Sequence, residues 1–556
     1  MTTRSPRAAA RVLATLLLLA LLAGCRSVPA TPFAVEEAAS SGETLAPLAA
    51  GAAAVDLDLP PGVPLGGYGG GTRRADWPAL FGMGIWGRIA IDAHQAWHED
   101  DPEAVCDMLA PSTGVADPCR AKAVCLRAGD GPPFALVSLD LIVSVAPLHE
   151  RIVELVADLG YTRASLTISA THTHSGPAAY IEVPFAKLAA MDNFRSEVFE
   201  AIAASAARAV REAHEAMRPA RVAFTSTLDG GRTGRARVAR NRRAYAFPAQ
   251  VDELDIDPEI NLVHLGDAAS GDTLCVIANY GVHPTVYGSR SMVVSADLGG
   301  AIERAVSARL GGAPVFFFNA AEGDVGPQGE GGDAAERCAA LGEAFADSVE
   351  PTLKRTAALV AKGEPSRVRI DAVVGRRGFG PAFTFVAAGS RERFWEGDPF
   401  FLVPFAEAIT LPLNALVWVP FGIDNVRFAV RVTNLTAGAI IDLQSYTPRN
   451  DFVLGAWRIR TDADEDVALV LVPGEATHDV GLALKRQAGA HGATRALVIG
   501  LANDAMSYIA SRQKYWLGGY EAHATLFGPE TGPRLLEGLD DALDVVYGTK
   551  NGADAP

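Results

Sequence analysis

The sequence predicts an α/β fold: one large domain with a mixed, largely buried β-sheet core flanked by helices. Two observations support this fold class. Apolar runs with strand character alternate along the chain with segments whose apolar residues recur every three or four positions, the pattern of amphipathic helices. In addition, no Pro-, Gly- or Ser-rich break and no internal repeat interrupts residues 55–548, which favours one domain over two.

The first 25 residues have the organisation of a secretory signal. A basic stretch with Arg4, Arg7 and Arg11 precedes an apolar run over residues 12–22, and Leu22–Cys25 resembles a bacterial lipobox, whose cysteine becomes lipidated. The apolar run is about half the ~20 residues that a membrane span requires, which favours cleavage over a transmembrane anchor. We therefore expect an exported lipoprotein, anchored to the bacterial cell envelope through Cys25, and in a Gram-negative cell located at the outer membrane or in the periplasm.

Composition sets the remaining boundaries. Residues 26–54 are rich in Ala, Ser, Pro and Glu and are expected to form a flexible tether, with the folded domain over 55–548 and a disordered tail over 549–556.

The net charge of −16 argues against nucleic acid, or an anionic membrane surface, as a partner. Five cysteines follow Cys25; in an oxidising compartment we expect a short disulfide between Cys106 and Cys119, and the odd count leaves at least one free thiol.

The elements of the domain follow in order. Helical periodicity predicts helices at 147–159 and 196–217. Apolar runs predict six strands, at 134–139, 166–170, 274–282, 314–318, 467–472 and 496–502. The last five of these strands end in turns that contain Gly or Pro and carry a His, Glu or Asp.

The second strand leads directly into the sequence Thr171-His172-Thr173-His174-Ser175-Gly176-Pro177. Because side chains of an extended strand alternate with a period of two, His172 and His174 are expected to project to the same side. Two imidazoles on one face can ligate a transition metal, or can pair one ligand with one catalytic base.

The other strand ends supply further ligand-competent side chains: His283, Glu322, Asp324, Glu475 and Asp504. Open α/β sheets bind ligands at the carboxyl ends of their strands, so the five turns are expected to form one composite site. His172, His283 and Glu475 make the two-His-one-carboxylate set of hydrolytic zinc sites, which leaves room for a water. The pattern by itself does not choose zinc over iron, whose facial triad uses the same ligands.

Several blocks of sequence occur in a fixed order along the domain: Gly66–Gly69, Thr171–Pro177, Asn241–Arg242, Val282–Thr285, Ser295–Asp297, Glu322–Val325, Phe385–Gly389, Pro473–Glu475, Tyr508, and Tyr520 through Thr525 to Pro529. In these blocks the chain resembles the neutral/alkaline, non-lysosomal ceramidases, zinc amidases that hydrolyse the N-acyl bond of ceramide. The resemblance implies a single zinc ion held by four ligands, His172, His283, Glu475 and Tyr508. It also implies a membrane-lipid substrate, ceramide or a relative.

The resemblance also assigns residues to the substrate side of the site. His174, Arg242 and Tyr520 fall on the substrate-facing positions, and these side chains are suitable donors to the oxyanion of a tetrahedral acyl intermediate. The block Glu322–Val325 adds Asp324 as a further candidate catalytic residue. His172 is thereby assigned to the metal, whereas His174 faces the substrate.

This sequence departs from the family in two places. Gly326 stands where the family has its nucleophilic serine, and glycine has no side chain to acylate, so we expect zinc-activated water to attack the carbonyl instead. The chain also ends soon after Pro529, so we expect the immunoglobulin-like C-terminal domain of the family to be absent.

Two alternatives stay open: a zinc hydrolase of a different amide or ester, suggested by the missing serine, and a catalytically silent lipid-binding lipoprotein of the envelope. The apolar segment 400–423 is interrupted by Pro404, Pro412, Pro420 and Glu407, which makes it a poor membrane span. It is either a pair of buried helices or an apolar lip that guides an acyl chain to the zinc.

Overall fold

The computed structural model describes residues 35–40, 44–68, 73, 109–182, 191–229, 233–236, 256–329, 332–379, 451–517, 521 and 524–549. Its central feature is a 13-stranded mixed sheet. The main path runs through β12 (Val315–Asn319), β10 (Thr273–Tyr280), β9 (Glu259–Asp267), β7 (Arg218–Leu228), β2 (Ala46–Asp56), β14 (Arg367–Gly378), β15 (Asp451–Thr461), β16 (Asp466–Leu471) and β18 (Arg495–Ile499). A branch leaves β2 through β4 (Arg120–Ala128), β5 (Phe134–Leu139) and β6 (Leu166–Ala170), and β1 (Glu36–Ala39) pairs with β14.

Three strand pairs of this sheet are parallel: β5 with β6, β10 with β12, and β16 with β18. The branched sheet folds over itself, because Val124 of β4, Ile277 of β10 and Leu469 of β16 lie in one buried apolar cluster. Phe134 and Trp457 meet edge to face inside it, with ring centroids 5.4 Å apart. The folded sheet therefore encloses an apolar core, and helices pack on its outer surface.

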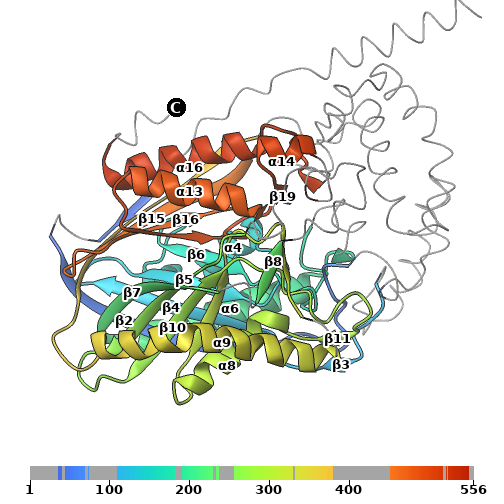
Figure 1. Ribbon diagram of the computed structural model, residues 1–556, viewed down its shortest axis with the longest axis horizontal. Coiled ribbons are helices and arrows are strands. Elements are labelled where there is room, and N and C mark those ends of the chain that lie inside the picture. Colours follow the sequence, from blue (N-terminus) through green and yellow to red (C-terminus); the bar gives the residue numbers. More distant parts are fainter. Residues whose placement is uncertain are drawn as a thin grey trace, which may run out of the picture.

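Three pairs of helices cover different parts of the outer surface of the sheet (Figure 1). Helices α4 (Ala146–Leu155) and α6 (Ser196–Glu215) pack on the β4–β6 branch, and the short η2 (Ala157–Leu159) follows α4. Helices α8 (Asp297–Arg309) and α9 (Ala334–Leu359) cover β9, β10 and β12. Helices α13 (His478–Ala490) and α16 (Thr531–Tyr547) cover β15, β16 and β18. The predicted single α/β domain with a buried mixed sheet is confirmed.

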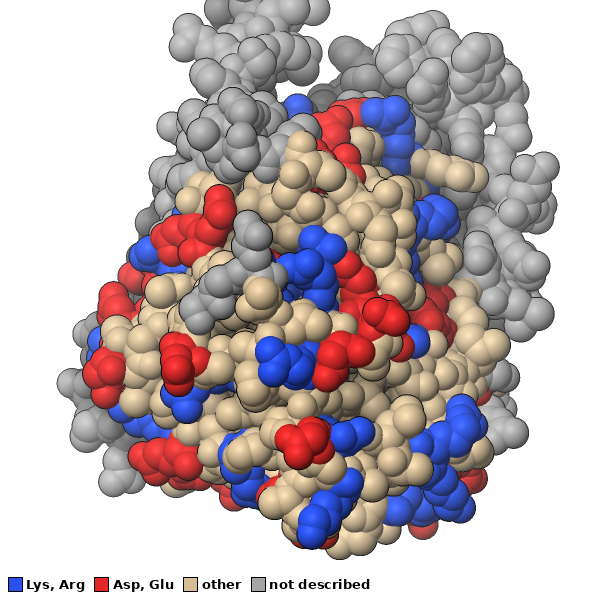
Figure 2. All heavy atoms as spheres, turned by 90° about the vertical axis from the view of Figure 1, so that its left-hand side faces the viewer, with Lys and Arg blue, Asp and Glu red and all other residues tan. Residues whose placement is uncertain are grey.

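Short paired segments lie beyond the ends of the long strands. They are β3 (Gly114–Val115) with β11 (Val293–Val294), β8 (Gly234–Ala236) with β13 (Val325–Pro327), and β17 (Glu475–Ala476) with β19 (Tyr508–Ile509). Helix α14 (Arg512–Leu517) follows β19. The face of the molecule in Figure 2 carries Lys and Arg side chains interspersed with Asp and Glu, without a large area of one sign.

The boundary predicted for the tether is wrong. Strand β1 lies within residues 26–54 and β2 overlaps the end of that range. Strand β2 is the branch point of the sheet. The reason is the small size of the side chains in this stretch, which permits close packing by α6: a methyl group at Gly51 would lie 2.1 Å from the carbonyl oxygen of Ala213. An Ala-rich composition that is typical of a linker is here a requirement of helix-on-sheet packing.

The predicted disulfide is not found either, since Cys119 is a buried free thiol, as are Cys125, Cys275 and Cys338. Cys106 lies outside the described residues, as do the signal segment, residues 400–423 and the tail from residue 550. Among the helices that the structure describes, none combines the length and apolarity needed to cross a membrane.

Candidate metal centre

The carboxyl ends of β6, β10, β12, β16 and β18 meet at one place. Two amide side chains link them: Asn319 donates to the carbonyls of Thr171 (3.0 Å) and Val282 (2.9 Å), and Asn503 accepts from the Ile168 amide (2.9 Å). Ser169 donates to the carbonyl of Gly500 at 2.8 Å. The composite site expected from the five strand ends is therefore present as a geometric arrangement.

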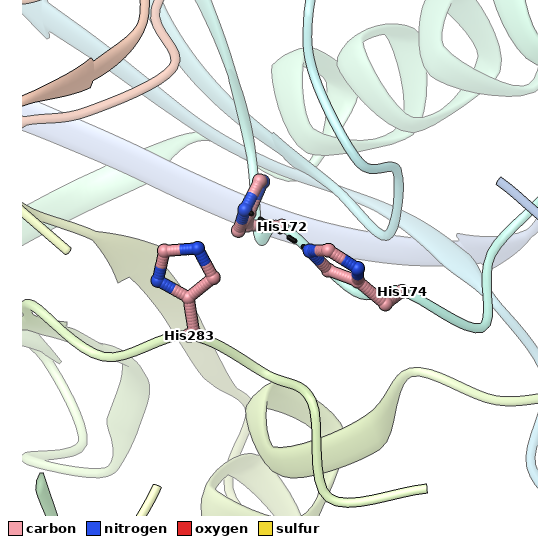
Figure 3. A group of neighbouring side chains, drawn as sticks. All are labelled: His172, His174 and His283. Carbon is pink, nitrogen blue, oxygen red and sulfur yellow. Dashed lines mark hydrogen bonds between the residues drawn. The ribbon is translucent and has the colours of Figure 1, made fainter. Parts of the chain in front are cut away.

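His172 reaches this place by a route that the sequence did not predict. Strand β6 ends at Ala170, and His172 has a left-handed backbone with φ of 71°, so the two histidines do not share an extended strand. Such a conformation costs about 1–3 kcal/mol for a non-glycine residue. It is held by two bonds, from the His172 amide to Leu141 O (2.9 Å) and between His172 Nδ1 and Ile142 O (2.6 Å). The Nε2 atoms of His172 and His174 nevertheless lie 3.2 Å apart (Figure 3).

His283 and Glu475 complete the centre of the site. Oε2 of Glu475 lies 3.3 Å from Nε2 of His172 and 3.2 Å from Nε2 of His283. The rings of His172 and His283 approach with centroids 4.5 Å apart, and His283 faces His172 in Figure 3. Tyr508 is the register partner of Glu475 across β17 and β19, and its hydroxyl lies 3.1 Å from His283 Nε2. The four predicted metal ligands are thus brought together.

The hydrogen bonds of the two imidazoles show what this centre requires. Nδ1 of His172 faces Ile142 O, and Nδ1 of His283 faces Glu322 O at 2.8 Å; a carbonyl only accepts, so each Nδ1 carries the proton. In the neutral rings each Nε2 is then an acceptor, and both point at the carboxylate of Glu475. Oε2 of Glu475 is buried and accepts no hydrogen bond.

A carboxylate oxygen facing two imidazole lone pairs is stable only with a cation between them. Protonating both rings would also supply donors, but it would bury two positive charges beside one carboxylate. Backbone carbonyls that fix the Nδ1 proton are the usual outer support of metal-bound histidines. The residues therefore fit a divalent metal ion.

His174 occupies the half-buried side of the site. Its ring lies 4.8 Å from that of Tyr68, and a methyl group at Gly67, which has φ of 100°, would lie 2.6 Å from His174 Nδ1. The buried guanidinium of Arg73 donates to the carbonyls of Gly66 (2.9 Å) and His174 (2.5 Å). The Gly66–Tyr68 segment is thus fastened directly to the His174 loop. Burial lowers the pKa of Arg73 to about 10, so it remains charged at neutral pH.

Asp324 belongs to a separate charged cluster beside the centre. Its carboxylate accepts from the His478 amide (2.8 Å), contacts His478 Nδ1 (2.9 Å) and pairs with Lys514 of α14. Burial opposes ionisation, but Lys514 and His478 lower the pKa of Asp324 strongly. Asp324 is thus placed to orient His478 rather than to contact His172.

Two predicted site residues, Arg242 and Tyr520, lie outside the described residues. Gly326 lies in β13 opposite Arg235, in extended backbone. Sequence reasoning missed Arg73, His478 and Lys514, because isolated charged residues carry no spacing signal. Glu322 was noted only as part of a strand-end turn, although its side chain is fully buried.

Comparisons with known proteins found a family model, relatives and solved structures that this chain resembles. Residues 107–380 match the family model described as neutral/alkaline non-lysosomal ceramidase, N-terminal. That region contains His172, His174 and His283, whereas Glu475 and Tyr508 lie beyond it.

The relatives with similar sequences are distant. The chain is 26% identical over 496 residues to a neutral ceramidase of Mycobacterium tuberculosis, covering 79% of this chain and 74% of the relative. Neutral ceramidase B of Dictyostelium discoideum is 26% identical over 230 residues, covering 38% and 31%.

Two solved structures share the fold. A crystal structure of neutral ceramidase from Pseudomonas aeruginosa superposes with a TM-score of 0.64 at 18% identity, covering 92% of this chain and 76% of that one. A ceramidase complexed with C2 gives a TM-score of 0.61 at 19% identity, covering 92% and 77%. At these identities the likeness shows the common fold.

Proposed function

Since this chain is related to the neutral/alkaline non-lysosomal ceramidases, we propose that it is a hydrolase of amide C–N bonds that releases the fatty acid of ceramide or a closely related N-acyl lipid. The observation that supports this most strongly is the buried Glu475 oxygen, which faces Nε2 of His172 and Nε2 of His283 without a hydrogen-bond donor. Such a set has no purpose in simple packing, whereas a metal hydrolase requires it.

The proposed ion is a single Zn²⁺ held by His172, His283, Glu475 and Tyr508. Two neutral imidazoles and a carboxylate are ligands that zinc accepts, and a tyrosine ligand would bring a second anionic oxygen. When bound, zinc lowers the pKa of a coordinated water toward neutrality and polarises the substrate carbonyl.

The remaining steps follow from the chain's own residues. Gly326 offers no hydroxyl, so we infer that water is the direct nucleophile and no acyl-enzyme forms. His174 lies beside the metal ligands and is oriented by Tyr68 and Arg73, which suits it to donate to the developing oxyanion or to hand a proton to the leaving amine. Arg242 and Tyr520 are proposed as further donors to the oxyanion.

We also propose that the protein acts from a membrane surface. The lipobox ending at Cys25 would anchor it to the cell envelope, close to a lipid substrate. The apolar segment 400–423 is proposed as the lip over which the acyl chain enters.

The test measures metal and product on the same preparation. Purified protein should contain about one zinc per chain and release fatty acid from ceramide; Glu475→Gln and His172→Ala should lose both properties. Zinc-free, active protein would refute the metal centre. A zinc-loaded protein that hydrolyses another acyl amide or ester but not ceramide would support the second candidate, which Gly326 favours because a changed nucleophile suits a changed acyl group. Bound lipid without turnover would indicate a lipid-binding protein.

A further inference from the structure

We propose that Glu322 is a further member of the metal centre, a second carboxylate that faces the cation together with His172 and Glu475. Glu322 follows β12, and its side chain is fully buried. A carboxylate oxygen of Glu322, a ring nitrogen of His172 and a carboxylate oxygen of Glu475 all lie within 4.8 Å of one another. This inference rests on the proposed metal-dependent function and adds a residue that neither the family resemblance nor the ligand pattern assigns.

The backbone holds Glu322 at this place on two sides. Its carbonyl oxygen accepts from His283 Nδ1 and from the Val325 amide, both at 2.8 Å, so the same residue orients one ligand and presents its carboxylate to another. The next residue donates from the Gly323 amide to Ala476 O at 2.8 Å, and a methyl group at Gly323 would lie 2.6 Å from Glu475 O. The Glu322 turn is thus packed directly against the strand that carries Glu475.

The neighbouring strand leaves room for the Glu322 carboxylate. Gly500 follows β18, and a methyl group there would lie 3.0 Å from Glu322 Oε2 and 2.1 Å from Ala320 O. Any larger residue at position 500 would push the turn and its carboxylate away from the centre. The glycine at position 500 is required mainly by the close approach of Ala320 O, and it also leaves space for the Glu322 carboxylate.

Charge gives the reason for a second carboxylate. Two ionised carboxylates buried within 4.8 Å of each other repel, and the cost of burying each charge is high unless a cation neutralises it. A divalent cation between Glu322 and Glu475 would balance the charges of these two carboxylates. The site thus matches a divalent transition metal in charge as well as in ligand type.

The test compares zinc affinity and apo-protein stability in the full chain. Zinc dissociation constants are measured by competition with a chromophoric chelator, and thermal unfolding is followed before and after metal removal. Glu322→Gln should weaken zinc binding by at least about tenfold, as expected for loss of a group that supports a metal. The apo Glu322→Gln protein should melt no lower than apo wild type, because one of two repelling charges has gone.

The matched control is Glu303→Gln, the same change in another buried glutamate. Glu303 pairs with Lys122 at 2.7 Å, so its loss should lower the apo melting temperature and leave zinc affinity within twofold. The two variants should therefore show opposite patterns.

A second readout covers the case in which Glu322→Gln does not fold. Glu322→Asp keeps the charge but withdraws the carboxylate by one methylene, and the cobalt-loaded protein should change its visible d–d absorption relative to wild type. Tight zinc binding by the wild type with unchanged affinity in Glu322→Gln, or an unchanged cobalt spectrum in Glu322→Asp, overturns this inference alone. A wild-type chain that binds no divalent cation overturns the proposed function, and the inference with it.

Discussion

Glu475 and Tyr508 are register partners in the short parallel pair of β17 and β19, and both reach the same nitrogen of His283. The distances from His283 Nε2 are 3.2 Å to Glu475 Oε2 and 3.1 Å to the Tyr508 hydroxyl. The pair joins the turn after β16 to the turn after β18, so the site depends on backbone pairing as much as on the ligands. A cation bound there would fasten two turns that are separate in sequence.

Metal removal should therefore destabilise the fold. Zinc at 100 times its dissociation constant stabilises a protein by about 2.7 kcal/mol, and removal by a chelator should lower the melting temperature accordingly. In Glu475→Gln the melting temperature should no longer depend on zinc, whereas Tyr508→Phe should retain part of the zinc-dependent difference. Differential scanning fluorimetry of apo and zinc-restored protein provides the measurement. Equal melting temperatures with and without zinc would contradict the role of the centre in stability.

Gly326 leads to a prediction about kinetics. Without a side chain to acylate, wild-type protein should release acid and amine at equal rates from the first turnover, with no burst of amine. Rapid-quench analysis of a labelled N-acyl substrate measures this. Gly326 lies in extended backbone, which a serine can also adopt. Gly326→Ser therefore serves as the comparison variant in the burst experiment. An amine burst in the wild type, or an acylated peptide in its digest, would show that another residue is the nucleophile.

The sequence predicted the strand ends and their grouping because both follow from local patterns: apolar runs stop where Gly, Pro and polar residues begin. It did not predict how His172 and His174 meet, because the left-handed turn at His172 depends on the carbonyls of Leu141 and Ile142 in a neighbouring loop. The tether boundary failed for a similar reason. Small residues over 46–54 suit a linker and a tightly packed strand equally well, and only the position of α6 decides between them.

Arg73 should contribute to stability well beyond an ordinary surface arginine. Its guanidinium bridges Gly66 and His174 and also donates to Ser291 O at 3.1 Å, so Arg73→Met removes the donor from one buried and two partly buried carbonyls. We expect a loss of about 3 kcal/mol in the free energy of unfolding, partly recovered by Arg73→Lys. Urea denaturation measures both. Arg208→Met is the control: Arg208 forms an exposed ion pair with Asp58, and its loss should cost at most about 0.5 kcal/mol. Similar losses in the two methionine variants would refute the role of Arg73.

Among the buried charged residues in the described part of the chain, Lys122 should cause the largest loss of stability when it is substituted. It lies between Asp140 and Glu303, at 2.7 Å from each, and Asp140 also accepts from the Thr171 hydroxyl at 3.1 Å, next to His172. Removing one partner of a buried ion pair costs about 3–5 kcal/mol, so Lys122→Met should approach that range.

Removing Lys122 and Glu303 together tests whether the loss comes from the stranded charge. The double variant Lys122→Met/Glu303→Gln should be more stable than Lys122→Met, because it buries fewer uncompensated charges. Additive losses in urea denaturation would show that the two residues act independently.

Asp297 makes the stability depend on pH in a defined window. Asp297 is the first residue of α8, and its carboxylate accepts from the amides of Val286 (3.1 Å) and Tyr287 (3.2 Å), which fixes the loop after His283. Burial raises the pKa of Asp297 to about 6, although these amide donors oppose the rise. The folded protein therefore holds the proton more tightly than the unfolded chain, whose aspartate has a pKa of about 3.9.

The sign of the effect follows from this difference. Below pH ~4 both states are protonated; as pH rises from ~4 to ~6 the unfolded chain releases the proton first, and stability is lost by an amount on the order of 3 kcal/mol. Asp297→Asn cannot titrate, so the stability of the wild type relative to this variant should fall between pH 4 and 6.5 and stay constant above. Urea denaturation of both proteins at four pH values isolates Asp297, because all other titrations cancel in the difference. A difference that is constant across the window, or that grows with pH, would show that Asp297 is already ionised in the folded protein at pH 4.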